Sequence, residues 1–159
     1  MLKAFDVDVL IEDNGWDQAL GGDAEAFCAK VLAAAATAEG KRGAVSVLLT
    51  TDETMQSLNR NWRGKDKPTN VLSFPSADGA GGLLGDVALG LGVVRAEAAA
   101  QSKTMAAHTA HMLVHGFLHL VGHDHEEESE AETMESRERA ILATLGYVDP
   151  YRLVGGDQA

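Results

Sequence analysis

All six histidines of this 159-residue chain fall between positions 108 and 125, and four of them lie in the stretch HGFLHLVGHDH. On a helix, His111, His115 and His119 recur every four residues and therefore line one face, with neighbouring Cβ atoms roughly 5–6 Å apart. One ion cannot bind all three, because eight residues of helix rise about 12 Å whereas zinc–imidazole bonds are only about 2.0–2.1 Å long. Any ion must therefore take an adjacent pair and a ligand from beyond the helix.

Gly122 provides the means to bring such a ligand back. Glycine readily adopts a positive φ at a helix end, so the chain can turn there toward the histidine pair. His115, His119 and His125 then follow the pattern H-x-x-x-H-x-x-G-x-x-H, which is the ligand spacing of the metzincin zinc peptidases. We predict that these three histidines bind one zinc ion per chain, with His123 as the alternative third ligand.

Three neutral histidines leave zinc an open fourth position, which is typical of a catalytic site. The peptidase motif carries a glutamate directly after the first histidine as general base, but this chain has Gly116 there. The sequence therefore disfavours a peptidase. A histidine-rich helix without an ion remains the alternative, and His108 and His111 are interpreted as core or surface histidines.

Length and hydrophobic periodicity predict one α+β domain over residues 1–159. The expected order is strand, helix, strand, helix, two strands and three helices, which favours a four-stranded mixed sheet covered by helices. A zincin-like metal site would lie on a central helix and the turn that follows it, and a flexible tail would start at about residue 152. The expected strands are 5–13, 44–50, 70–74 and about 86–91, and the expected helices include 24–39, 93–103, 104–121 and 127–145. A further helix is expected after a cap at Thr51 or Asp52, and it leads Arg63 into a loop.

The net charge of −11 opposes nucleic acid as a partner at long range, but the charge is unevenly distributed. Residues 124–138 carry most of the acidic excess, whereas the loop RNWRGKDK at 60–67 is locally basic and could hold a phosphate chain. Charges at positions 3, 6 and 8 would interrupt a signal peptide, and no apolar run reaches membrane-spanning length. The single cysteine, Cys28, has no disulfide partner. We expect a cytoplasmic protein without membrane contact.

Taken together, HGFLHLVGHDH, NWRGKDKPTNVLSFP, LLGDVALG and MESRERAILATLGYVDPY resemble the YbeY family of bacterial endoribonucleases. This resemblance covers about residues 45–151. It implies a zincin-like α+β fold, zinc on His115, His119 and His125, cleavage of single-stranded RNA, and work on the small ribosomal subunit with its proteins or assembly factors. It also places Arg63 in the family's basic loop, and we assign Arg63 and His115 as the catalytic residues.

The function so predicted is maturation of small-subunit (16S) ribosomal RNA, including its 3′ end, and ribosome quality control. Two alternatives remain: a ribosome-assembly RNA-binding protein with a structural zinc, and a zinc hydrolase of another substrate class. Arg63 could stabilise developing charge on a phosphate or simply pair with Asp66 on the surface. Asp86 is either a hydrogen-bond partner of a ligand histidine or a turn residue, and Trp62 is either a base-stacking or a core side chain.

Overall fold

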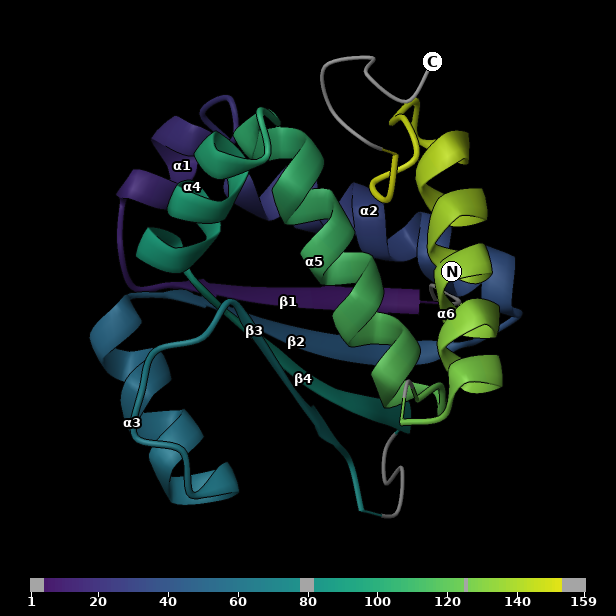
Figure 1. Cartoon of the computed structure of the whole chain (residues 1–159), viewed down its shortest axis with the longest axis horizontal. Helices are drawn as coiled ribbons and strands as arrows, with labels where there is room; N and C mark the ends of the chain where they lie inside the picture. The colour runs from purple at the N-terminus through teal and green to yellow at the C-terminus, as the bar shows by residue number, and fades with distance from the viewer. Residues whose placement is uncertain (1–4, 78–81, 125, 153–159) are drawn as a thin grey trace.

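The computed structural model describes residues 5–77, 82–124 and 126–152 (Figure 1). The predicted tail beyond residue 152 and the predicted ligand His125 therefore lie outside the described residues. The elements in chain order are β1 (Phe5–Ile11), α1 (Gly15–Ala19), α2 (Ala24–Glu39), β2 (Gly43–Thr50), α3 (Asp52–Arg63), β3 (Val71–Pro75), β4 (Leu83–Gly90), α4 (Leu91–Ala100), α5 (Met105–Leu120) and α6 (Glu128–Thr144).

The four strands form one mixed sheet in the order β1-β2-β4-β3, which confirms the predicted architecture. β1, β2 and β4 are parallel, and β3 runs antiparallel to β4 at the edge of the sheet. The alternation FDVDVLI places every second side chain of β1 on the covered face, as expected for a strand buried on one side.

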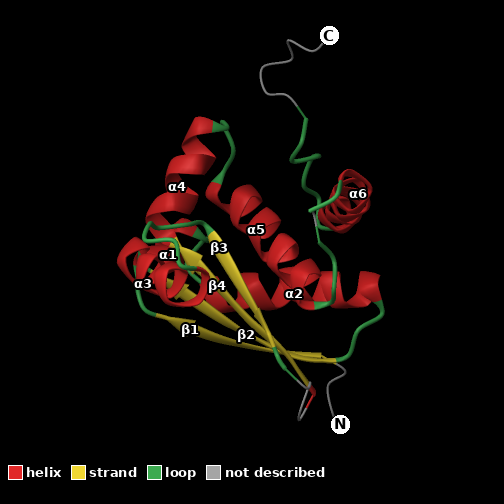
Figure 2. Ribbon diagram, turned by 60° about the horizontal axis from the view of Figure 1, so that its bottom comes forward, coloured by secondary structure: helices red, strands yellow, loops and turns green. Residues whose placement is uncertain are grey.

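Helices cover the two faces of the sheet unequally, as Figure 2 shows. α2 and α5 pack on one face, and α6 lies against α5 and α2 outside them. α3 lies on the opposite face, because Val87 of β4 faces Gly116 of α5 while its neighbour Ala88 joins a small cluster with Met55 of α3. The main core therefore lies between the sheet and α2, α5 and α6.

Side-chain caps begin three of the predicted helices. Asp23, Thr51 and Thr104 each accept a hydrogen bond from a backbone N–H three residues later, as these residue types do at helix starts. One helix was not predicted: α1 is only five residues long, and its first turn lacks a side-chain cap. It buries Trp16, whose indole N–H donates to the carbonyl of Thr50. None of the helices in the described ranges is long and apolar enough to cross a lipid bilayer.

Candidate metal and RNA-cleavage site

α5 carries the predicted histidine row through the middle of the molecule. His111 is buried, whereas the side chains of His115 and His119 are partly exposed. The helix ends at Leu120, and Gly122 follows with a φ of 101°, which lies in the region that favours glycine. The amide of His123 then donates to the carbonyl of Leu118 at 2.9 Å, so the chain turns back at the predicted position.

His115 and His119 meet as an adjacent pair. Their Nε2 atoms lie 3.2 Å apart, and their rings are 4.7 Å apart between centroids. Two nitrogens bound tetrahedrally to one zinc at about 2.0–2.1 Å would be separated by roughly 3.3 Å, so the pair fits a shared ion. Within the described part of the chain, no three histidine, cysteine or acidic side chains form a metal-binding group. The third ligand therefore stays a prediction, because His125 is outside that part.

Glu138 of α6 is hydrogen-bonded to this histidine row and is completely buried. Its Oε2 accepts from His115 Nδ1 at 2.7 Å, and its Oε1 accepts from His111 Nε2 at 2.8 Å and from the hydroxyl of Tyr151. Burial raises the pKa of the Glu138 carboxyl, but hydrogen bonds from these three partners outweigh burial and lower that pKa to about 2. Glu138 is therefore a carboxylate at neutral pH.

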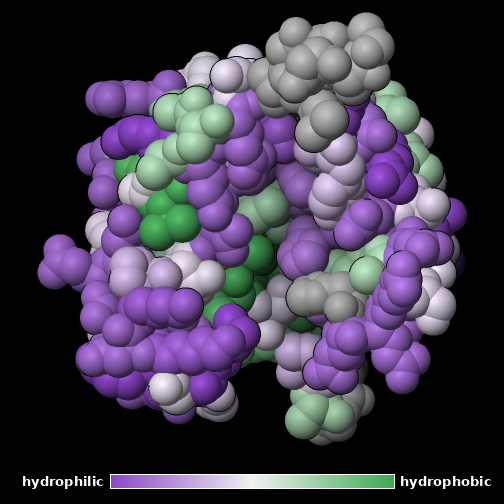
Figure 3. All heavy atoms as spheres, in the orientation of Figure 1, coloured by the Kyte–Doolittle hydropathy of each residue, from purple (hydrophilic) through white to green (hydrophobic). Residues whose placement is uncertain are grey.

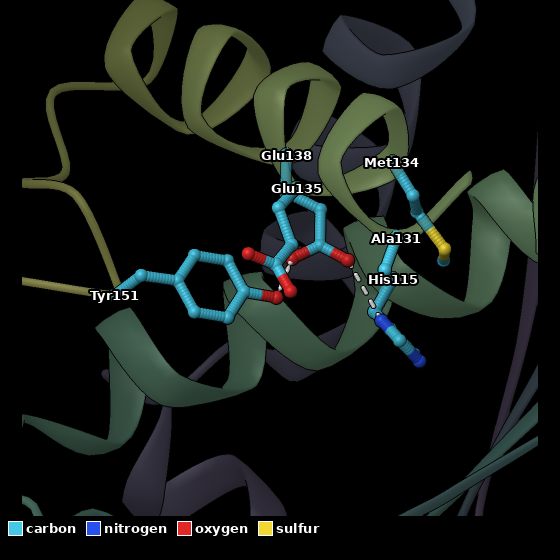
Figure 4. Close-up of a pocket in the computed structure, with 6 residues that line it drawn as sticks. All are labelled: His115, Ala131, Met134, Glu135, Glu138 and Tyr151. Carbon is cyan, nitrogen blue, oxygen red and sulfur yellow. Dashed lines mark hydrogen bonds and ion pairs between the residues drawn. The ribbon is translucent and has the colours of Figure 1, made fainter. Parts of the chain in front are cut away.

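A cavity of about 300 Å³ lies beside this network, between α5, α6 and the segment that contains Tyr151 (Figure 4). Figure 4 shows the Tyr151 hydroxyl and one His115 nitrogen converging on Glu138, with Glu135 beside them. Burial and, after it, the contact with Glu138 raise the pKa of Tyr151. Its hydroxyl therefore stays protonated and donates a hydrogen bond to Glu138.

His123, the alternative third ligand, is bound elsewhere. Its Nε2 lies 2.9 Å from Oε1 of Glu39 at the end of α2, and Arg137 of α6 donates to the other carboxylate oxygen at 2.7 Å. Burial raises the pKa of Glu39, but the contacts with His123 and Arg137 outweigh burial and lower that pKa, so the carboxylate is charged. The contact ties the turn after α5 to α2 and α6.

Arg63 lines the same groove as His115 and His119, although it lies more than fifty residues earlier in the sequence. The groove has a volume of about 650 Å³, and Figure 3 shows this face of the molecule hollowed beside the hydrophilic surface of α3. Its described lining comes from the end of α3, from β3 with the residues just before it, and from the end of α5 with the turn that follows: Arg63, Thr69, Asn70, Val71, Leu72, Ser73, Pro75, His115, His119, Gly122, His123, Asp124 and Glu126.

The basic loop does not use Arg63 to neutralise Asp66. Arg60 forms that ion pair, at 3.3 Å, and Gln56 also donates to Asp66. Arg63 is exposed, and no ion pair involves it within the described ranges. The alternative interpretation, a surface pair of Arg63 with Asp66, is therefore excluded, and the guanidinium is available to an anion. Trp62 is 70% exposed and its ring packs edge-on with Phe74, so it is not a core residue.

Gly116 packs directly against the sheet, which explains why a glutamate cannot stand after the first histidine here. A Cβ at this position would lie 2.9 Å from Val87 Cγ1 and 3.1 Å from Ser73 Oγ. The Ser73 hydroxyl also donates to the Gly116 carbonyl at 2.9 Å. The helix therefore approaches β3 and β4 closely, and the position has no room for a catalytic side chain.

Asp86 does not support a ligand histidine. It is exposed and points to the opposite face of the sheet, because its neighbours Gly85 and Val87 are the β4 residues that face α5. The carboxylate that accepts a hydrogen bond from a predicted ligand histidine is Glu138. Its role was not predicted from the sequence. A signal was present, because Glu138 shares a helical face with the apolar Met134, Ile141 and Leu142.

Known proteins support a single family assignment. The family model for Endoribonuclease YbeY matches residues 11–146. An Endoribonuclease YbeY from Azorhizobium caulinodans is 52% identical over 156 residues, which cover 94% of this chain and 98% of that protein. One from Rhodopseudomonas palustris is 49% identical over 151 residues, which cover 91% of this chain and 80% of that protein.

A solved structure is similar in fold. The solution structure of TM1509 from Thermotoga maritima superposes with a TM-score of 0.58 and covers 95% of this chain and 99% of its own. Its sequence identity is 22%, so this likeness concerns the fold alone.

Proposed function

The chain belongs to the YbeY endoribonuclease family, and we propose that it is a zinc-dependent endoribonuclease that cuts single-stranded RNA. The observation that carries this proposal is that Arg63, His115 and His119 line one open groove. We further propose that the substrate is small-subunit (16S) ribosomal RNA, including its 3′ end, that the enzyme also serves ribosome quality control, and that it works in the cytoplasm.

In this proposal His115, His119 and His125 hold one zinc ion. The 3.2 Å separation of the two Nε2 atoms supports the pair as ligands. A zinc ion bound there would supply a Lewis acid that polarises a phosphoryl oxygen and acidifies water. Gly116 leaves no general base at the position that peptidases use, which favours a phosphodiester over a peptide substrate.

Arg63 has the properties that phosphate recognition needs. A guanidinium presents several N–H donors in a fixed planar fork and can hold two phosphate oxygens at once. Because Arg63 lines the same groove as the histidines, it can hold a phosphodiester beside them and stabilise the negative charge that builds up during cleavage. Lys65 and Lys67, both exposed, extend the same basic loop along an RNA backbone.

Substrate selection requires more than this loop. The chain has a net charge of −11, so naked RNA should bind weakly, with an affinity that falls steeply with salt. Glu127, Glu128 and Glu130, at the start of α6, are exposed and could face basic ribosomal proteins or an assembly factor. We infer that such partners on the small subunit present the RNA strand to the groove.

The cleavage activity is tested with labelled single-stranded RNA, wild-type protein and an Arg63→Glu variant purified in the same way. Wild type should cut the RNA after zinc is added, and the variant should not cut it although it folds and binds zinc. Equal cleavage by both would point to a contaminating nuclease and would contradict the proposal. If neither protein cuts RNA but both bind small subunits, the RNA-binding protein with a structural zinc is the better assignment.

The guided presentation needs a separate experiment. Cleavage of free ribosomal RNA is compared with cleavage of small subunits over a salt series, using wild type and a variant in which Glu127, Glu128 and Glu130 are changed to Gln. Small subunits should be cut faster and at fewer positions, and the variant should lose part of that advantage. If naked RNA is cut as fast and as specifically by both proteins, partner guidance is wrong.

A further inference from the structure

Burying the carboxylate of Glu138 is energetically unfavourable, which indicates that this side chain has a role beyond packing. It is the only acidic side chain among the described residues that is completely buried. A carboxylate moved out of water is strongly disfavoured unless hydrogen bonds and charges compensate for the lost hydration. An apolar residue would suit this position between Met134 and Ile141 better if packing were its only function.

The geometry of Glu138 determines the tautomer of His115. Three groups that can donate, His111 Nε2, the Tyr151 hydroxyl and His115 Nδ1, surround the two oxygens of Glu138. This arrangement fits a carboxylate, which can only accept, so Nδ1 of His115, 2.7 Å from Oε2, carries the proton. A neutral imidazole has one such proton, which leaves the lone pair on Nε2. Nε2 is the atom that faces His119, and Figure 4 shows this end of the ring directed away from Glu138.

Tyr151 holds Glu138 in this position from the other side. Its hydroxyl donates to Oε1, which also accepts from His111 Nε2, so Oε2 is left to His115. Tyr151 itself is fastened to α6, because its ring lies 5.2 Å from the guanidinium carbon of Arg139. Arg139 also binds Asp149 at 3.1 Å, and Asp149 accepts the backbone N–H of Tyr151.

We propose that Glu138 is the positioning residue that fixes His115 as a zinc ligand, and that the 149–152 turn holds Glu138 in place through Tyr151. The inference rests on the zinc site of the proposed function, but it concerns residues outside the predicted ligand set. Carboxylates that accept from the second nitrogen of a ligand histidine typically raise metal affinity about 10- to 100-fold. Loss of the Glu138 carboxylate should weaken zinc binding by that factor.

The test measures the zinc dissociation constant of the full chain by competition with a chromogenic chelator. Glu138→Gln keeps the shape of the side chain but presents an amide that cannot accept at both positions, and it should bind zinc about 10- to 100-fold more weakly. Tyr151→Phe should show a smaller loss in the same direction. Glu135→Gln is the matched control, because Glu135 lines the same cavity and carries the same charge but makes no hydrogen bond to His111 or His115 in the described structure. It should bind zinc like wild type.

A second readout does not depend on metal. Nitrogen-15 NMR of the metal-free protein distinguishes the two imidazole tautomers, and His115 should be protonated on Nδ1 in wild type and in Glu135→Gln. Glu138→Gln should show a mixture or the opposite tautomer. If Glu138→Gln does not fold, the zinc dissociation constant and the His115 tautomer are both measured on Tyr151→Phe.

The outcomes separate this inference from the proposed function. Wild-type zinc affinity in both Glu138→Gln and Tyr151→Phe, or a wild-type His115 protonated on Nε2, overturns the inference and leaves the zinc site standing. A wild-type chain that binds no zinc overturns the ligand assignment and the inference with it.

Discussion

Replacing Gly116 with alanine should destabilise the protein, although alanine is the better helix former. The added methyl group would lie 2.9 Å from Val87 Cγ1, 3.1 Å from Ser73 Oγ and 3.3 Å from Val71 Cγ2. Overpacking a core in this way typically costs about 1–3 kcal/mol. Val87 is β-branched, fully buried and on β4, which is paired on both sides, so it cannot move away easily.

Alanine gains about 1 kcal/mol over glycine in helix propensity. With overpacking in the upper half of its range, the net loss in the free energy of unfolding is about 1–2 kcal/mol. For a chain of this size, each kcal/mol lowers the melting temperature by about 2–4 °C, so Gly116→Ala should melt about 2–8 °C below wild type. Differential scanning calorimetry of the metal-free proteins measures this difference without a contribution from bound zinc.

A double-mutant cycle provides the control. Val87→Ala removes the nearest contact and should be destabilising alone, but less so in the Gly116→Ala background, with a coupling of at least about 0.5 kcal/mol. A melting temperature of Gly116→Ala at or above that of wild type, or strictly additive effects, would refute the close packing of α5 on the sheet.

Three further predictions follow from the site and the core. His119→Ala should lose the zinc ion in metal analysis, whereas His123→Ala should retain one per chain because His123 is bound to Glu39; full zinc in His119→Ala would contradict the ligand assignment. Arg63→Glu should melt within about 2 °C of wild type, since exposed substitutions usually change stability by less than about 0.5 kcal/mol, and a large drop would make Arg63 structural. Burial raises the pKa of Cys28 from 9.0 to about 12, so the folded chain keeps a thiol proton that the unfolded chain loses. Stability should therefore fall as the pH rises from about 9 toward 12, and urea titrations should show a shallower fall for Cys28→Ala.

Local signals predicted the helices and the turn that carry the histidines. Thr104 satisfies a backbone donor at the start of α5, and Gly122 permits the turn after it, so both ends of the helix are determined by adjacent residues. α1 lacked such a signal: it is too short for a hydrophobic period, and Trp16 is buried by distant parts of the chain.

The supporting contacts of the site depend on tertiary packing and could not be predicted in the same way. Asp86 could be interpreted from the sequence as a partner of a ligand histidine or as a turn residue, and strand alternation, which turns it to the opposite face, excludes the first interpretation. Glu138 lies in a run of acids, and its helical face, shared with Met134 and Ile141, indicates burial, but only the packing of α6 on α5 shows that it contacts the histidines.

The order in which the chain is synthesised adds a consequence to the contact between Glu138 and His115. The sheet is complete at Gly90, and α5 can cover it as soon as residue 120 is available. Tyr151 follows about 30 residues later, which is roughly 2–6 s at 5–20 residues per second. During that interval a nascent chain can have a folded sheet and both helix histidines, but His115 lacks the network that orients it. Full zinc affinity should therefore be reached only after the sheet and α5 have folded, when α6 and Tyr151 complete the network around His115.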